Sequence, residues 1–337
     1  MALLCCLRLF AQERGADHAE QIITLHAYAD LVQMPALVLD HSRKTIDPRI
    51  DERRFSIRVD SGPWFKVTHV RAEGDDPISL SILLDRSALE LLPNIATQIA
   101  NFATTQLTSR DHISLYGLGC GLDRSLDNAA GKDAAIMARV DALVIPWLNR
   151  IDKESPCTAT PVYLWDVLGF IAKQMEGLPA RRVILVISDG RDKGSAHTWN
   201  QVREYAQIAG IAVFGITMLP TRTSVVVART DAYPFLSICE LSGGILMPTT
   251  PQFMDKTLQR FIKMVRERYI LEFPRPSNAT KGEHALDIKI AGGDNYFIRS
   301  TGVSVRLPDE LILKDPTTVP SDPSRAPEQG KRRILRP

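Results

Sequence analysis

The chain of 337 residues is long enough for one large domain with appendages or for two domains. Its formal net charge of only +2 disfavours nucleic acid as the main partner, because phosphate binding needs a concentrated basic face. No apolar stretch is long enough to span a bilayer, so we expect no integral membrane span.

The N-terminal segment and the cysteines leave the cellular compartment open. Residues 1–20 begin with MALLCCLRLFAQ, which is apolar like a secretory signal but is interrupted by Arg8 and has no basic n-region. We interpret this segment as a partial signal segment or as an ordinary terminus. The five cysteines form no CxxC pair and no metal-ligand spacing, so buried free thiols are expected and no disulfide framework is indicated.

Residues 21–74 have the pattern of β-structure. The stretch IITLHAYADLVQMPALVLD is rich in apolar and β-branched residues, which are typical of strands. The stretch FSIRVDSGPWFKVTHVRAE alternates around an Asp-Ser-Gly-Pro turn. A small antiparallel sheet or half-sandwich fits this segment.

Residues 75–269 alternate between strand and helix patterns. Helical spacing of apolar residues separates short continuous apolar runs, which are typical of strands covered on both faces. This alternation implies right-handed crossovers, and it predicts the fold class α/β with a doubly wound, mostly parallel sheet. The predicted strands are 78–85, 112–119, 181–190, 211–219 and 243–250, and the predicted helices are 87–107, 160–178, 197–210 and 250–269.

The remaining residues divide into two zones. Residues 270–307 return to a β pattern in YILEFPRPSN, GEHALDIKIA and YFIRSTGVSVRL. Residues 308–337 are rich in proline and charge and poor in aromatic residues, so a disordered tail is predicted there.

Polar residues follow two of the apolar runs, at the sheet edge where open parallel sheets bind ligands. Thr160 is followed by Pro161, a pattern typical of a helix start that lies between these two strands in the sequence. The oxygen atoms of such residues are hard ligands that suit Mg²⁺, Ca²⁺ or Mn²⁺ better than zinc, and an open coordination position would accept a carboxylate from a partner protein. The residues after the first run are Asp85, Arg86 and Ser87, and those after the central run are Ser188, Asp189, Gly190, Arg191 and Asp192.

The ordered set Asp-x-Ser, Thr and Ser-Asp-Gly resembles the von Willebrand factor type A (VWFA) domain and its metal-ion-dependent adhesion site. The flanking stretches around VQMPALVLD and RERYILEFPRPSN resemble the β segments of the secreted bacterial VWFA-related proteins typical of acidobacteria. The resemblance covers nearly all of the chain between Gln21 and Leu307. It implies a Rossmann-like VWFA domain at 75–269 with an additional small β module formed by the N- and C-terminal flanks.

The resemblance also implies a site and a function. Leu89 stands where the family pattern Asp-x-Ser-x-Ser has a second serine, so one direct ligand is missing. The implied function is non-enzymatic protein binding of the adhesion type through a degenerate metal site, in a secreted, periplasmic or cell-envelope protein, with a cytoplasmic location as the alternative. The implied metal ligands are Asp85, Ser87, Thr160 and Asp189, and the residues assigned to partner binding are Arg86, Thr158 and Arg191, of which Thr158 is also an alternative ligand.

Two alternative functions remain open at the sequence level. One is a metal-assisted phosphoester hydrolase at the same edge, although no G-x-S-x-G elbow or P-loop is found. The other is a structural envelope protein with a vestigial metal site. Asp166 and Asp192 are interpreted as solvated or helix-surface charges, and Trp165 and Phe170 as core residues at helical spacing.

Overall fold

The computed structural model shows a large α/β unit and a small two-stranded unit. The large unit comprises Asp30–Leu307 and Asp322–Pro337, and the small one Met1–Ala29 and Pro308–Ser321. The structure describes residues 26–27, 31–46, 49–86, 94–151, 163–218, 233–275, 282–284, 286–301, 303–305 and 318–319.

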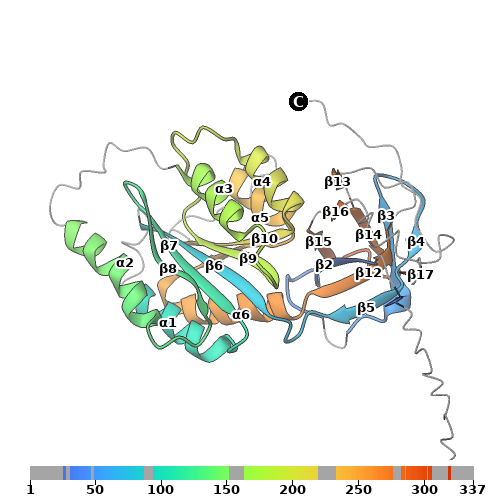
Figure 1. Ribbon diagram of the computed structural model, residues 1–337, viewed down its shortest axis with the longest axis horizontal. Helices are drawn as coiled ribbons and strands as arrows, with labels where there is room; N and C mark the ends of the chain where they lie inside the picture. Colours follow the sequence, from blue (N-terminus) through green and yellow to red (C-terminus); the bar gives the residue numbers. More distant parts are fainter. Residues whose placement is uncertain are drawn as a thin grey trace, which may run out of the picture. The chain divides into compact units, whose positions relative to one another are not determined.

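A six-stranded sheet forms the centre of the large unit, in the order β11-β10-β9-β6-β7-β8 (Figure 1). All neighbouring strands are parallel except β8, which runs antiparallel to β7 at the edge. Counted in chain order within this sheet, the strands follow the doubly wound order 3-2-1-4-5-6. The predicted fold class is therefore confirmed. The strands are β6 (Ile78–Asp85), β7 (His112–Leu118), β8 (Leu122–Ala130), β9 (Arg181–Ile187), β10 (Ile211–Met218) and β11 (Leu246–Thr249).

Helices cover both faces of this sheet (Figure 1). Since successive side chains of a strand point to opposite faces, β9 contributes Val183 and Leu185 to one core and Ile184 and Val186 to the other. The first core contains residues of α1, α2 and α6, and the second contains residues of α3, α4 and α5. The helices are α1 (Ile95–Gln106), α2 (Ile136–Ile151), α3 (Leu164–Met175), α4 (Trp199–Ile208), α5 (Pro234–Leu241) and α6 (Met254–Arg266), with short 3-10 helices at Glu52–Arg54 and Pro251–Phe253.

Strands from the two flanks of the α/β domain pair with one another to form the β module. The order β15-β2-β12-β5 interleaves strands of the N-terminal and C-terminal flanks in one antiparallel sheet. A second sheet, β14-β3-β4, again pairs the two flanks, and a third pair joins β13 to β16. These strands are β2 (Leu31–Leu39), β3 (Phe55–Val59), β4 (Phe65–Lys66), β5 (His69–Ala72), β12 (Tyr269–Pro274), β13 (Gly282–His284), β14 (Leu286–Ile290), β15 (Phe297–Ser300) and β16 (Val303–Val305).

Strand β2 joins the β module to the α/β domain, because its two faces belong to different cores. Met34, Ala36 and Val38 pack with the other residues of the β module. Leu37 and Leu39 instead belong to the core between the parallel sheet and helices α1, α2 and α6. The two parts of the large unit therefore share buried apolar surface, whose removal from water stabilises them together.

The small unit is a parallel pair of β1 (His26–Ala27) with β17 (Thr318–Val319). Strand β17 lies within residues 308–337, where the sequence predicts a disordered tail. The rest of that tail and the predicted signal segment 1–20 lie outside the described residues. In the described part of the chain, no helix has the length and apolar character needed to cross a membrane.

Candidate functional site at the carboxyl edge of the sheet

The candidate site lies where the strand order reverses, between β6 and β9. Leu84 of β6 pairs with Ile187 of β9, so the next residues, Asp85 and Ser188, reach the same edge of the sheet. Both side chains are buried, with Asp85 only 1 % exposed. Doubly wound sheets bind ligands at such a switch point, outside the carboxyl ends of the strands.

A hydrogen bond links the ends of the two strands. The Ser188 hydroxyl donates to Asp85 Oδ2 at 2.6 Å, and it accepts from the backbone N–H of Gly190 at 3.0 Å. Gly190 has a φ of +77°, and an added Cβ would lie 2.7 Å from Phe235 Cδ1. The Ser-Asp-Gly sequence therefore forms a turn that needs glycine at its third position, and the serine ties this turn to Asp85.

Asp189 occupies the middle of this turn and remains partly exposed. Its Oδ1 accepts from the Arg191 backbone N–H at 2.9 Å, and its Oδ2 lies 3.1 Å from Arg191 Nε. The Tyr233 hydroxyl donates to the Asp189 backbone carbonyl at 3.0 Å. Burial and the negative charge of Asp189 raise the pKa of Tyr233, so its hydroxyl keeps the proton that it donates.

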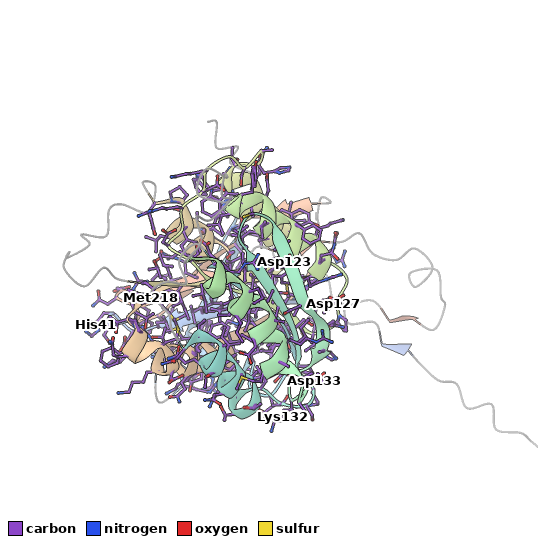
Figure 2. The ribbon with its side chains drawn as sticks, turned by 90° about the vertical axis from the view of Figure 1, so that its left-hand side faces the viewer. His41, Asp123, Asp127, Lys132, Asp133 and Met218 are labelled. Carbon is purple, nitrogen blue, oxygen red and sulfur yellow. The ribbon has the colours of Figure 1, made fainter. Side chains whose placement is uncertain are left out.

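Arg86 points away from this turn, toward strand β8. Its Nη2 lies 2.6 Å from Asp123 Oδ2, and its side chain is only 8 % exposed. Gly117 of β7 makes room for the guanidinium, because a Cβ there would lie 3.2 Å from Arg86 Nε. Figure 2 shows Asp123 at one end of β8, and Lys132 and Asp133 just beyond the other end of this strand. The charge of Arg86 is thus matched by a β8 carboxylate.

Asp166 lies at the surface of α3, as interpreted from the sequence, and Asp192 is partly exposed, but both carboxylates are also hydrogen-bonded. Asp192 accepts a hydrogen bond from the first turn of α3, and Asp166 accepts two backbone N–H groups of the loop after β9. The sequence does not predict the bonds between α3 and this loop, because these partners are distant in sequence and leave no local pattern. His197 is exposed just before α4.

The other predicted site residues, Ser87, Thr158 and Thr160, lie outside the described residues, as does Leu89. In the described part of the chain, no three histidine, cysteine, aspartate or glutamate side chains form a cluster that could hold a metal ion. The oxygen donors described at the edge are the two carboxylates and the serine hydroxyl that connects their strands. These hard donors suit a hydrated Mg²⁺ or Mn²⁺ ion better than zinc.

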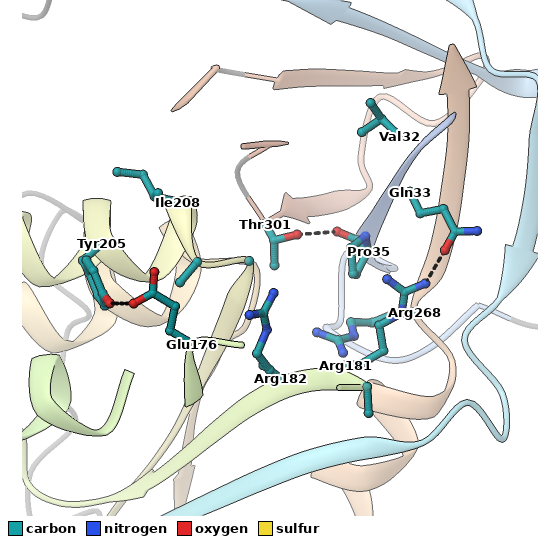
Figure 3. A pocket seen from close by; sticks show the side chains of 13 residues that line it. Val32, Gln33, Pro35, Glu176, Arg181, Arg182, Tyr205, Ile208, Arg268 and Thr301 are labelled. Carbon is teal, nitrogen blue, oxygen red and sulfur yellow. Dashed lines mark hydrogen bonds between the residues drawn. The ribbon is translucent and has the colours of Figure 1, made fainter. Parts of the chain in front are cut away.

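A cavity of about 330 Å³ lies at the opposite edge of the sheet, where β9 and β10 begin (Figure 3). Arg181 and Arg182 contribute to its lining. Arg181 donates to Gln33 Oε1 at 2.9 Å, and Tyr205 donates to Glu176 Oε2 at 2.8 Å. Burial lowers the pKa of Arg181. The described lining contains none of the predicted site residues, so the cavity is separate from the switch point.

Cys120 is disulfide-bonded, whereas the sequence predicts buried free thiols and no disulfide framework. It lies in the turn between β7 and β8, and its partner lies outside the described residues because Cys239 is free. Cys239 is buried as predicted, and burial raises the pKa of its thiol well above the ordinary value. The free-thiol prediction is thus confirmed for Cys239 and wrong for Cys120.

Peptide mapping will check the disulfide. When the unfolded protein is alkylated without reductant, we expect the label on Cys239 and none on Cys120, since only a free thiol reacts. Reduction before alkylation will add the label to Cys120. Label on Cys120 without reduction would contradict the assignment.

No family model matches the chain, and no curated protein matches it. Among solved structures, proximal thread matrix protein 1 from the mussel byssus is similar at 10 % identity and a TM-score of 0.43, covering 68 % of this chain and 50 % of that one. BatB, a conserved hypothetical protein from Bacteroides thetaiotaomicron, is similar at 14 % identity and a TM-score of 0.39, covering 57 % and 99 %. The vWF domain of a type V pili tip protein from Porphyromonas gingivalis is similar at 11 % identity and a TM-score of 0.38, covering 57 % and 95 %.

The chain spans about half the length of the mussel protein, another structure of which has a zinc-occupied MIDAS motif. The fold of this chain follows from its own strand order. Five parallel strands and one antiparallel edge strand are arranged as 3-2-1-4-5-6, with helices on both faces and Asp85 at the switch point. The chain therefore has a doubly wound α/β fold, the fold that the sequence resemblance to the von Willebrand factor type A domain implies.

Proposed function

We propose that this chain is a non-enzymatic protein-binding domain of the adhesion type, which presents the carboxyl edge of its parallel sheet to another protein. One observation carries the proposal. Asp85 ends β6 and Asp189 follows the adjacent strand β9, and Ser188 connects them by hydrogen bonds to Asp85 and to the Asp189 turn. A buried carboxylate, Asp85, and a partly exposed one, Asp189, at the same edge of the sheet support the proposal.

The proposed site holds Mg²⁺, or Mn²⁺ or Ca²⁺, through Asp85, Ser87, Thr160 and Asp189. Mg²⁺ keeps several of its waters, so few protein oxygens suffice and the aspartates can bind through water. Leu89 supplies no oxygen where a serine would, which weakens the proposed site without changing its chemistry. A carboxylate of the partner would complete the coordination.

Arg191 is the proposed contact residue that the structure shows on the surface. Its side chain is 77 % exposed and lies beside Asp189, where it would meet an acidic partner. Arg86, which the sequence analysis assigns to the same role, is buried against Asp123 and would act by balancing charge beneath the edge. Thr158 remains a proposed contact or an alternative ligand.

We also propose a secreted, periplasmic or cell-envelope location. The disulfide at Cys120 supports it, because structural disulfides persist in oxidising compartments and are rare in the cytosol. A cytoplasmic protein would be expected to keep this cysteine reduced. Detection of the oxidised, processed chain in an envelope or culture fraction will check the proposal.

Calorimetric titration with Mg²⁺ and Mn²⁺ tests the proposed metal site. We expect Asp85→Asn, which retains an acceptor for Ser188, to weaken Mn²⁺ binding by about 10–100-fold, the usual effect of losing a group that holds the ion through water. Leu89→Ser is expected to strengthen binding by about 10-fold by restoring the family pattern. Asp127→Asn, an exposed carboxylate on β8, serves as the matched control and should leave binding unchanged.

Two results would contradict the proposed metal site, and a third would contradict the proposed function. Equal affinities for wild type, Asp85→Asn and Leu89→Ser would show that any bound ion sits elsewhere. Absence of binding in all of them would leave protein recognition to the loops alone. Turnover of p-nitrophenyl phosphate that disappears in Asp85→Asn would replace the binding function with the hydrolase.

A further inference from the structure

We propose that Asp166 and Asp192 form a reciprocal clasp, which holds the loop after β9 in the conformation that presents Asp189 to the cation. This inference rests on the proposed function. The loop comprises residues 188–198, between the end of β9 and the start of α4. The clasp joins this loop to the first turn of α3.

One half of the clasp is a loop carboxylate that accepts from the helix. Asp192 Oδ1 accepts from the Trp165 backbone N–H at 3.2 Å and from the Ser195 hydroxyl at 2.6 Å. Ser195 Oγ in turn accepts from the Asp166 backbone N–H at 3.2 Å. Side chains of the loop thus accept hydrogen bonds from two backbone N–H groups in the first turn of α3, which have no acceptor within the helix. A negative charge is also favourable at this end of a helix.

The other half is a helix carboxylate that accepts from the loop. Asp166 Oδ2 accepts from the Ala196 backbone N–H at 2.9 Å, and Oδ1 accepts from the His197 backbone N–H at 2.9 Å. The His197 imidazole Nδ1 lies 2.7 Å from the same Oδ1. Burial raises the pKa of Asp166, but these donors lower it more, and the net pKa lies below its ordinary value. The carboxylate therefore stays ionised and keeps accepting both amides.

The clasp matters because the other bonds described for this loop gather at its start, around Ser188 and Asp189. At its start the Ser188 hydroxyl is bonded to Asp85, and Gly190 and Gly194 both have positive φ. Glycines cost more conformational entropy to order than other residues, so this loop needs anchors on both sides of Asp189. Ser188 and the Tyr233 hydroxyl hold the start of the loop, and the clasp holds the part that follows Asp189.

Helix α3 is a suitable anchor because its inner face is buried. Trp165 and Leu168 belong to the core on the α3 side of the sheet. In the sequence, α3 begins four residues after Thr160, which the family resemblance assigns as a ligand. The clasp therefore ties Asp189 to the helix that follows the proposed threonine ligand. Rigid support of this kind determines how well a metal site is preorganised.

The test measures amide hydrogen exchange and, by calorimetry, Mn²⁺ affinity. It uses two variants of the full chain, Asp166→Asn and Asp192→Asn. Each amide side chain offers one acceptor oxygen where the carboxylate offered two. We expect faster exchange across residues 189–197 and Mn²⁺ affinity lower by about 10–100-fold, the usual effect of losing an outer-shell partner. Asp255→Asn, an exposed carboxylate in the first turn of α6, is the matched control and should change neither quantity. Circular dichroism will verify that every variant is folded at the temperature of the titration.

The outcomes separate this inference from the proposed function. Faster loop exchange with unchanged Mn²⁺ affinity would show that the clasp stabilises the loop but does not position Asp189 for the cation. Unchanged exchange would overturn it directly. If wild type binds no Mn²⁺, the proposed metal site fails, and exchange at Asp189–Arg191 alone decides whether the clasp orders this turn.

Discussion

Glu73→Gln is expected to lower the free energy of unfolding by about 3–5 kcal/mol, because it leaves a buried guanidinium without its counter-charge. Arg268 donates to Glu73 through Nε at 2.6 Å and through Nη2 at 2.8 Å. Both side chains are essentially inaccessible, at 1 % and 0 % exposure. They lie at the junction of α6, β5 and β12, where the α/β domain meets the β module. Urea denaturation followed by circular dichroism will measure the loss.

Asp287→Asn is the matched control for this effect. Asp287 and Arg58 also form a close ion pair, at 2.7 Å, but their side chains are 51 % and 35 % exposed. Solvent screens such a pair, so we expect a loss of about 0–1 kcal/mol. Similar losses for Glu73→Gln and Asp287→Asn would show that burial does not distinguish the two pairs.

Gly244→Ala is expected to destabilise the protein by about 3 kcal/mol or more, since overpacking against rigid backbone cannot be relieved by rotating a side chain. An alanine Cβ at this position would lie 2.1 Å from the Val213 carbonyl oxygen of β10. That strand lies inside the sheet, paired with both β9 and β11, and it cannot shift without breaking those pairs. The melting temperature and the urea midpoint will report the change.

Gly169→Ala, in contrast to Gly244→Ala, is expected to increase the stability of the protein. Gly169 lies within α3, and an added Cβ there would meet only Val202 Cγ2, at an ordinary 3.7 Å. Alanine favours the helix over glycine by about 0.5–1 kcal/mol, so a small gain in stability is expected. Equal losses at Gly244 and Gly169 would refute the steric explanation.

The parallel strands and the location of the candidate site could be predicted from the sequence. Strand β6 has the bounds predicted for it, Ile78–Asp85, and all eight of its residues are buried. Since parallel strands are covered on both faces, they appear as continuous apolar runs, and the first charged residue marks the strand end. Asp85 and Asp189 could be assigned to one sheet edge by this reasoning alone.

Elements without such a run were missed. Strand β8 has the sequence LDRSLDNAA and no fully buried residue, because it pairs on one side only, at the edge of the sheet. Its strand conformation comes from pairing with β7 rather than from local apolar pattern. Phe170 was expected in the core with Trp165, but it is 46 % exposed. Five positions in a helix turn the chain through more than one full turn, so the two side chains leave different faces.

Only the tertiary structure determined which polar groups are hydrogen-bonded or ion-paired with one another. Asp166 accepts a hydrogen bond from a residue 30 positions away in the sequence, and Asp192 accepts one from a residue 27 positions away. Glu73 and Arg268, which form an ion pair, are 195 positions apart. The disulfide of Cys120 belongs to the same class of long-range contact. Apolar burial repeats with the period of the strand or helix and is therefore visible locally. A hydrogen bond or ion pair between distant residues has no period, and its partners become known only when the fold brings them together.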